Sequence, residues 1–113
     1  MTLPPETKKL LADMLDFGEQ IATFVKAKSE ADYLSDVMMQ RAVERCFAVI
    51  GEALTALRRS DPATAQSLTD WRSIISFRNV LIHAYGGIDQ QRTWRIIEEG
   101  LPVLLREVRA LLA

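Results

Sequence analysis

The sequence predicts an all-α protein, a single domain over residues 1–113 that folds as an up-and-down four-helix bundle. Apolar residues recur at intervals of three and four along most of the chain, which is the period of helices with one buried face. Sustained alternation of apolar and polar residues, which would predict strands, is nearly absent. With 49% hydrophobic and 26% charged residues, the composition is that of a globular domain and not of a disordered segment. Since so short a chain buries a limited share of its surface, a two-fold dimer is expected.

Two long helices are expected in the first half of the chain. An apolar stripe, Leu10, Met14, Phe17, Ile21 and Phe24, predicts a helix that begins after the segment LPPE and ends near residues 26–29. The polar segment SEADYLSD is predicted to be a turn, in which Ser35 or Asp36 caps the next helix.

The second helix is expected over residues 36–58, where a wide apolar face includes Val43, Phe47, Ile50 and Leu54. Gly51 lies inside this pattern. A glycine within a helix costs about 1 kcal/mol relative to alanine, so close packing of another backbone is the expected reason for it.

Two further helices are expected after a loop that contains the breaker Asp61-Pro62. The third begins at Trp71, is capped by Thr69 or Asp70, and ends at the pair Gly86-Gly87. The fourth follows the cap Asp89. Its apolar stripe runs from Trp94 to Leu111 and contains Pro102, which should kink or restart the helix.

The charge of the chain excludes one class of partner and suggests another. A formal net charge of −1 excludes a strongly basic, histone-like binder. However, residues 41–95 carry 8 basic side chains, all arginine, against 5 acidic ones. Arginine suits planar, bidentate recognition of phosphate, while a solvated helix surface with ordinary ion pairs is the alternative interpretation.

The remaining composition indicates the compartment and the absence of a metal. The only cysteine, Cys46, lies in the apolar run CFAVI and is expected to be a small buried hydrophobic residue. One cysteine and one histidine cannot form a structural zinc site within one chain. Neither a metal nor a cofactor is predicted. The start MTLPPETKK lacks the pattern of a signal peptide, and no apolar run reaches the length of a membrane span. A cytoplasmic protein without a membrane partner is therefore predicted.

The segment FRNVLIHAYGG, residues 77–87, contains the only histidine and places four polar residues close together. On an ideal helix Arg78 and Tyr85 project about 20° apart, and Asn79 and His83 about 40° apart. Arg78 and His83 are about 140° apart, so they would not lie side by side on one regular helix. Either the helix loosens before Gly86, or the two side chains meet across a dimer.

Each of these residues also has a purely structural explanation. His83 near a helix C-terminus can interact favourably with the helix dipole, and Tyr85 can be a core aromatic residue. Arg78 can pair with Asp70 or Glu52, and Asn79 can cap a neighbouring helix. Taken singly, none of them indicates a function.

Taken together, RNVLIHAY has the pattern of an arginine, four residues, a histidine, any residue and a tyrosine, and it resembles the signature of the HEPN superfamily, more narrowly of HepT-like toxins. The segment AVERCFAVIGEAL is similar to the second core helix of that family, including its Gly-Glu-Ala step. DWRSIISFRNVLIHAYGGID resembles the motif helix, and TWRIIEEGLPVLL resembles the final helix with its Leu-Pro step. The resemblance covers about residues 10–112.

This resemblance implies a metal-independent endoribonuclease that acts on RNA as a homodimer. It further implies the toxin of a toxin–antitoxin pair, whose antitoxin is an MntA-like minimal nucleotidyltransferase. Such an antitoxin can transfer AMP from ATP onto the motif tyrosine, here Tyr85, and so silence the toxin.

The chemistry of metal-independent RNA cleavage is consistent with these residues. A base must take the proton of the 2′-hydroxyl, an acid must protonate the leaving 5′-oxygen, and positive charge must stabilise the phosphorane. His83 is assigned as general acid or base, Arg78 as the residue that stabilises the transition state, and Asn79 as a supporting residue that orients His83 or the phosphate. Two imidazoles would have to come from two chains, although water or Tyr85 could replace one of them. Candidate contacts to the RNA backbone, each with a surface ion pair as the alternative, are Arg41, Arg45, Arg72, Arg92 and Arg95.

Two other functions compete with this interpretation. A non-catalytic helical subunit could hold the nucleotide or substrate of a two-component nucleotidyltransferase, using Arg78 and His83 to bind phosphate. A purely structural dimer would use the same residues for packing and capping. A DNA-binding regulator is less favoured, because the chain is not basic and no separate recognition helix stands out.

Overall fold

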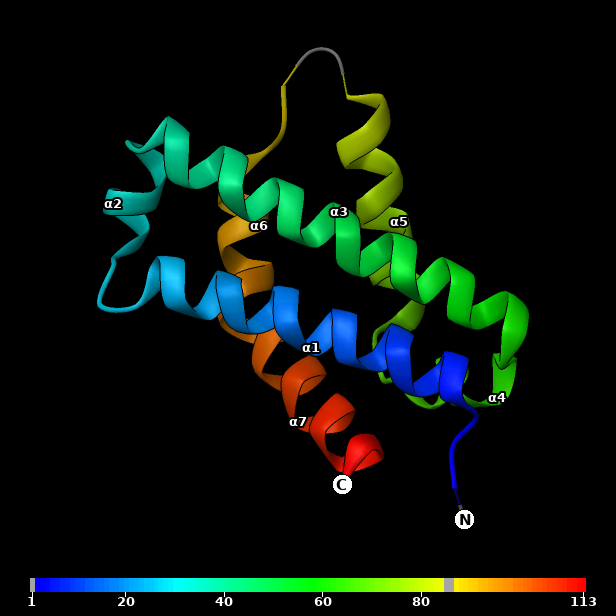
Figure 1. Cartoon of the computed structure of the whole chain (residues 1–113). Coiled ribbons are helices and arrows are strands. Elements are labelled where there is room, and N and C mark those ends of the chain that lie inside the picture. Colours follow the sequence, from blue (N-terminus) through cyan, green and yellow to red (C-terminus); the bar gives the residue numbers. More distant parts are fainter. Residues whose placement is uncertain (1, 85–86) are drawn as a thin grey trace.

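The computed structural model describes residues 2–84 and 87–113, and within these ranges it contains helices and loops but no strand. In chain order the elements are α1 (Pro5–Val25), α2 (Glu30–Leu34), α3 (Val37–Ser60), α4 (Pro62–Ser67), α5 (Trp71–His83), α6 (Gln90–Arg95), the π-helical turn η1 (Ile96–Gly100) and α7 (Leu101–Leu112). The last three follow one another without a loop and form a single rod. The predicted all-α bundle is confirmed, with α1, α3, α5 and this rod as its four long members (Figure 1).

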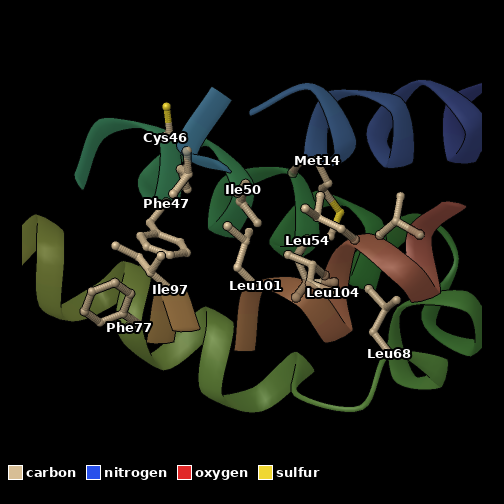
Figure 2. Close-up of a cluster of buried hydrophobic side chains, with 14 of the residues drawn as sticks. Met14, Cys46, Phe47, Ile50, Leu54, Leu68, Phe77, Ile97, Leu101 and Leu104 are labelled. Carbon is tan, nitrogen blue, oxygen red and sulfur yellow. The ribbon is translucent and has the colours of Figure 1, made fainter. Parts of the chain in front are cut away.

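The long helices pack around α3. Helix α1 lies beside α3 and runs in the opposite direction, while α5 and α7 contact α3 and α1 respectively (Figure 1). The buried side chains form one continuous core. Figure 2 shows Met14, Leu54 and Leu104, from three different helices, turned toward one another in it. Towards the other end of this view, Phe47 and Phe77 meet edge to face with ring centroids 5.4 Å apart.

Side-chain caps fix several helix starts, as expected. The carboxylate of Asp36 accepts a hydrogen bond from the backbone N–H of Met39, and that of Asp89 accepts one from Arg92. Each cap satisfies a backbone donor that the first helical turn leaves free. Of the two predicted caps of α3, the residue that acts is therefore Asp36.

Two segments predicted as a turn and a loop contain short helices, so those predictions were wrong in part. Ser29 and Asp32 form a reciprocal capping box at the start of α2. Asp61 caps α4 through the N–H of Thr64, and Pro62 is the first residue of that helix. A satisfied cap and a proline with preset φ can stabilise one or two turns that have no apolar periodicity.

Helix α5 begins at Trp71 as predicted, but it ends at His83, before the glycine pair. The N–H of Thr69 donates to the Glu107 carboxylate at 2.9 Å, and its hydroxyl donates to the same group, which ties the start of α5 to α7. Gly87 has φ +104°, a left-handed conformation that favours glycine. Gly86, the other predicted end residue, lies outside the described residues.

The last rod contains the interruption predicted at Pro102, in a specific form. The N–H of Leu101 donates to the carbonyl of Ile96, five residues back, which closes the π turn η1. Pro102 is then the second residue of α7, where no intrahelical donor is required of it. The helix therefore restarts at Leu101. No helix in the described part of the chain is long and apolar enough to cross a membrane.

Candidate functional site

Arg78 lies where α5 makes its closest approach to α3. A Cβ atom added at Gly51 would lie 2.2 Å from the Cβ and 2.6 Å from the Cγ of Arg78. Carbon atoms in contact are normally about 3.5–4.0 Å apart, so only glycine fits at this position of α3. The close packing predicted from Gly51 is thus confirmed, and its partner is the arginine of the motif.

The guanidinium group of Arg78 is held by two further side chains. Its Nη1 donates to Oδ1 of Asn79 at 3.2 Å, and its Nη2 lies 3.9 Å from Oε1 of Glu52. Of the two predicted acidic partners, Glu52 is therefore the one that the structure provides. The Nε atom of Arg78 is buried and has no hydrogen-bond partner in the described part of the chain.

This arrangement leaves Arg78 oriented but incompletely satisfied. The side chain is 26% exposed, and its ion pair with Glu52 is close to the longest separation at which such a pair forms. A guanidinium with five donors and few protein acceptors can still bind an anion in a bidentate manner. The predicted supporting residue, Asn79, contacts Arg78 through its amide oxygen.

His83 is the last residue of α5, and its side chain is exposed. It lies five residues after Arg78, which corresponds to about 7.5 Å along the axis and about 140° around it. Because α5 is helical as far as His83, both residues belong to one regular helix and point in different directions. The two hydrogen-bonding and ionic partners of Arg78 are Asn79 and Glu52, among the described side chains, and not His83.

The tyrosine of the motif cannot be placed in the same way. Tyr85 lies outside the described residues, together with its neighbour Gly86. The prediction that Tyr85 aligns with Arg78 on the helix therefore stays a prediction. Ala84 follows α5 as its C-cap residue, with an extended backbone conformation.

The five arginines predicted to contact RNA do not form one patch. Arg41 pairs with Glu44 at 3.0 Å, and Arg72 stacks on the Trp71 ring at 5.0 Å, at the opposite end of α5 from His83. Arg41 and Arg45 are both exposed and lie one turn apart on the same face of α3 as Glu52. The other two, Arg92 and Arg95, lie on α6.

A partly buried network of polar side chains, which the sequence did not indicate, connects α2, α3 and α6. The hydroxyl of Tyr33 donates to Gln90 at 2.8 Å, and the amide of Gln90 donates to Glu44 at 2.6 Å. Glu44 in turn pairs with Arg41. Burial, and then the nearby carboxylate of Glu44, raise the pKa of Tyr33. These residues are far apart in sequence, and each is an ordinary polar residue. No local sequence pattern could therefore have revealed the network.

Two hollows were likewise not predicted. One, of about 370 Å³, lies between α5 and the rod formed by α6, η1 and α7. The other, of about 460 Å³, lies at the C-terminal end of α5, where its lining includes Arg41, Glu44, Ala84 and Gly87. The only sequence signal for the first was Pro102, which marks the interruption of the rod.

Comparison with known proteins gives a consistent result. The model of the family described as "Ribonuclease HepT-like" matches residues 14–111. A "Putative RNase" of Methanocaldococcus jannaschii is 30% identical and covers 91% of this chain and 94% of its own length. The "Probable ribonuclease HepT" of Thermococcus cleftensis is 33% identical, over 86% of this chain and 87% of its own. A "Putative RNase" of Caldanaerobacter subterraneus subsp. tengcongensis is 32% identical, over 90% of each chain. No solved structure matches the chain significantly.

Proposed function

Because the chain belongs to the HepT-like ribonuclease family, and its ribonuclease assignment is thereby confirmed, we propose that it is a metal-independent endoribonuclease that acts as the toxin of a toxin–antitoxin pair. The observation that carries the proposal is the position of Arg78, fixed against Gly51, with a guanidinium group that is partly exposed and only loosely paired with Glu52. His83 follows on the same helix with an exposed imidazole. In this proposal Arg78 stabilises the phosphorane, and His83 transfers the protons.

The active form is a homodimer. A single chain supplies one imidazole, so a reaction with an imidazole acid and an imidazole base requires two chains. Ile75, Arg78 and Ile82 recur at intervals of three and four, so they share one side of α5. Ile82 is 44% exposed there, one residue before His83. Because Ile75 and Arg78 pack within the chain, a two-fold contact would involve the exposed C-terminal end of α5, where it would bury Ile82 and bring two copies of His83 to one cleft.

The regulator is a minimal nucleotidyltransferase, the MntA-like antitoxin, which transfers AMP onto Tyr85. The described residues that flank this position, Ala84 and Gly87, both line the hollow of about 460 Å³, so space for a nucleotide adjoins the segment. An added AMP brings bulk and negative charge next to a site that must accept a phosphate, which would block RNA binding.

The proposal is tested by cleavage of total cellular RNA by the purified chain in excess EDTA, after intact mass has shown that Tyr85 is unmodified. Cleavage by the wild type with 2′,3′-cyclic phosphate ends, and its loss in His83→Ala, is the expected result. If unmodified, dimeric protein leaves RNA intact, the proposal fails, and the non-catalytic subunit of a nucleotidyltransferase becomes the better interpretation.

The dimer is tested separately by Ile82→Glu, which should convert the dimer to a monomer in sedimentation experiments and abolish cleavage. The matched control is Phe24→Glu on α1, where an apolar side chain has similar exposure, 38%, at a distance from α5. Dimers that persist in Ile82→Glu would contradict the proposed interface.

A further inference from the structure

The hollow between α5 and the final rod opens on a different side of α5 from Arg78. Phe77 lines it, and successive residues of a helix point about 100° apart, so Arg78 is directed toward α3 instead. The walls of the hollow come from α3, α5 and all three parts of the rod. The lining residues used below are Ser73 and Phe77 on one side and Arg92, Arg95, Glu99 and Gly100 on the other.

The interior of this groove is apolar, and part of it is aromatic. Phe47 and Phe77 meet edge to face at 5.4 Å, with an interplanar angle of 80°, and Leu101 and Leu104 continue the apolar lining toward α7. Figure 2 shows Phe77 next to Ile97 in the core, with Leu101 further along. A volume of about 370 Å³ is at the small end of the range for ligand pockets. It is too small for a helix of a partner protein but suits one small planar molecule.

The rim carries charges of both signs. The guanidinium of Arg92 lies over the Phe77 ring, 5.4 Å from its centroid, and Arg95 follows one turn later on α6. Asp70 and Glu99 supply carboxylates at the same rim, and both side chains are exposed. A ligand that fits this rim must offer an anionic group to the arginines and hydrogen-bond donors to the carboxylates.

We propose that this groove binds one unpaired nucleotide of the RNA substrate, with a base that carries an amino group. The inference rests on the proposed function and assigns a second contact point to the same substrate. Unstacked bases bind against aromatic rings and arginine planes. The Phe77 ring is only 3% exposed, so the surface offered to a base is the guanidinium plane of Arg92 that covers this ring. Arg95 binds the phosphate, and the carboxylates accept hydrogen bonds from the amino group of adenine, cytosine or guanine. Uracil lacks this amino group.

The position of the groove suits a single strand of RNA that also reaches His83, the proposed catalytic histidine. Phe77 and His83 are six residues apart on α5, which corresponds to about 9 Å along the helix axis. A short stretch of single-stranded RNA that crosses α5 spans that distance. The π turn forms one wall, and such turns occur often where a helix borders a functional site.

The test is a chemical-shift titration of the full chain with AMP, CMP, GMP and UMP in turn. The double variant Arg92→Gln, Arg95→Gln is compared with Arg106→Gln, an exposed arginine on α7 that lies outside the groove. We expect saturable shifts at Ser73 and Gly100 with AMP, CMP and GMP, and at least tenfold weaker binding in the double variant. Arg106→Gln should bind as the parent does, and UMP should bind most weakly.

Several results would overturn the inference. These are an absence of groove shifts, equal binding by the double variant, equal binding of UMP, and the same shifts with inorganic phosphate alone. Groove shifts that depend on protein concentration without nucleotide would show that a second copy occupies the groove, and would also overturn it. Cleavage by the wild type is measured in parallel. Cleavage without groove binding would overturn only this inference. Groove binding without cleavage would overturn only the proposed function.

Discussion

Replacing Gly51 by alanine tests how firmly the bundle holds Arg78. The new methyl carbon would lie 2.2 Å from the Cβ of Arg78, so Arg78 and the backbone that carries it must retreat by more than about 1 Å to restore ordinary contact. Overpacking of this kind costs about 1–3 kcal/mol, and the gain in helix propensity returns about 1 kcal/mol. We therefore expect the free energy of unfolding to fall by at most about 2 kcal/mol.

The effect on RNA cleavage should be far larger than the effect on stability. A catalytic group displaced by about 1 Å can lose on the order of 100-fold in rate, and Arg78 would also move relative to Glu52 and Asn79. Urea unfolding gives the stability change, and cleavage of total RNA in EDTA gives the rate. The diagnostic result is a folded, dimeric Gly51→Ala protein with strongly reduced cleavage.

Gly18→Ala is the matched control. Its methyl group would also meet a neighbour too closely, the Cδ2 of Leu105 at 2.6 Å, but that atom is the end of a flexible side chain that can rotate away. Stability should change little and cleavage should not change. The reasoning is refuted if Gly51→Ala cleaves RNA at the wild-type rate, or if both alanine variants lose cleavage equally.

Three further predictions concern single buried or capping groups. Hydrogen bonds from Thr64 lower the pKa of Asp61, so this carboxylate stabilises the fold above its unfolded pKa and loses that effect as the pH falls through the folded value. Asp61→Ala should therefore lower the midpoint of thermal unfolding clearly at about pH 7 and hardly at about pH 2. Equal shifts of the midpoint at both pH values would contradict this reasoning. Tyr33→Phe removes the bond to Gln90 and should cost about 1 kcal/mol in urea unfolding, whereas an unchanged midpoint would show that the bond contributes nothing net. Burial raises the pKa of the Cys46 thiol, so Ellman's reagent should modify it slowly in native protein and rapidly in urea, and fast native reaction would disprove its burial.

Most of the fold could be predicted because apolar spacing is a local property. The stripes that led to α1, α3 and the final rod are the faces that bury Met14, Leu54 and Leu104. The short helices α2 and α4 were missed for the converse reason. They contain little apolar periodicity and depend on caps, which are the reciprocal pair Ser29 and Asp32 for α2 and the Asp61 carboxylate for α4.

The site could be predicted only as far as its residues follow one another along the chain. The motif gave Arg78, Asn79 and His83, and the helical period already indicated that the arginine and the histidine diverge. It could not show that Asn79 contacts Arg78, because that depends on side-chain rotamers. Nor could it show whether Asp70 or Glu52 pairs with Arg78, because Glu52 is brought there by packing at Gly51.

The π turn at Ile96–Gly100 also constrains how the length of this chain can vary. A π turn holds one residue more than the α-helical turn that it replaces, so the deletion of Glu98 would leave a regular α-helix with both flanking halves facing as before. Pro102 would then lie in a helix interior, and its ring would clash with the carbonyl four residues back. The proline is therefore tolerated only together with the extra residue. Descendants of this sequence that lose the extra residue should also lose the proline, and should carry a residue with a free N–H at its position.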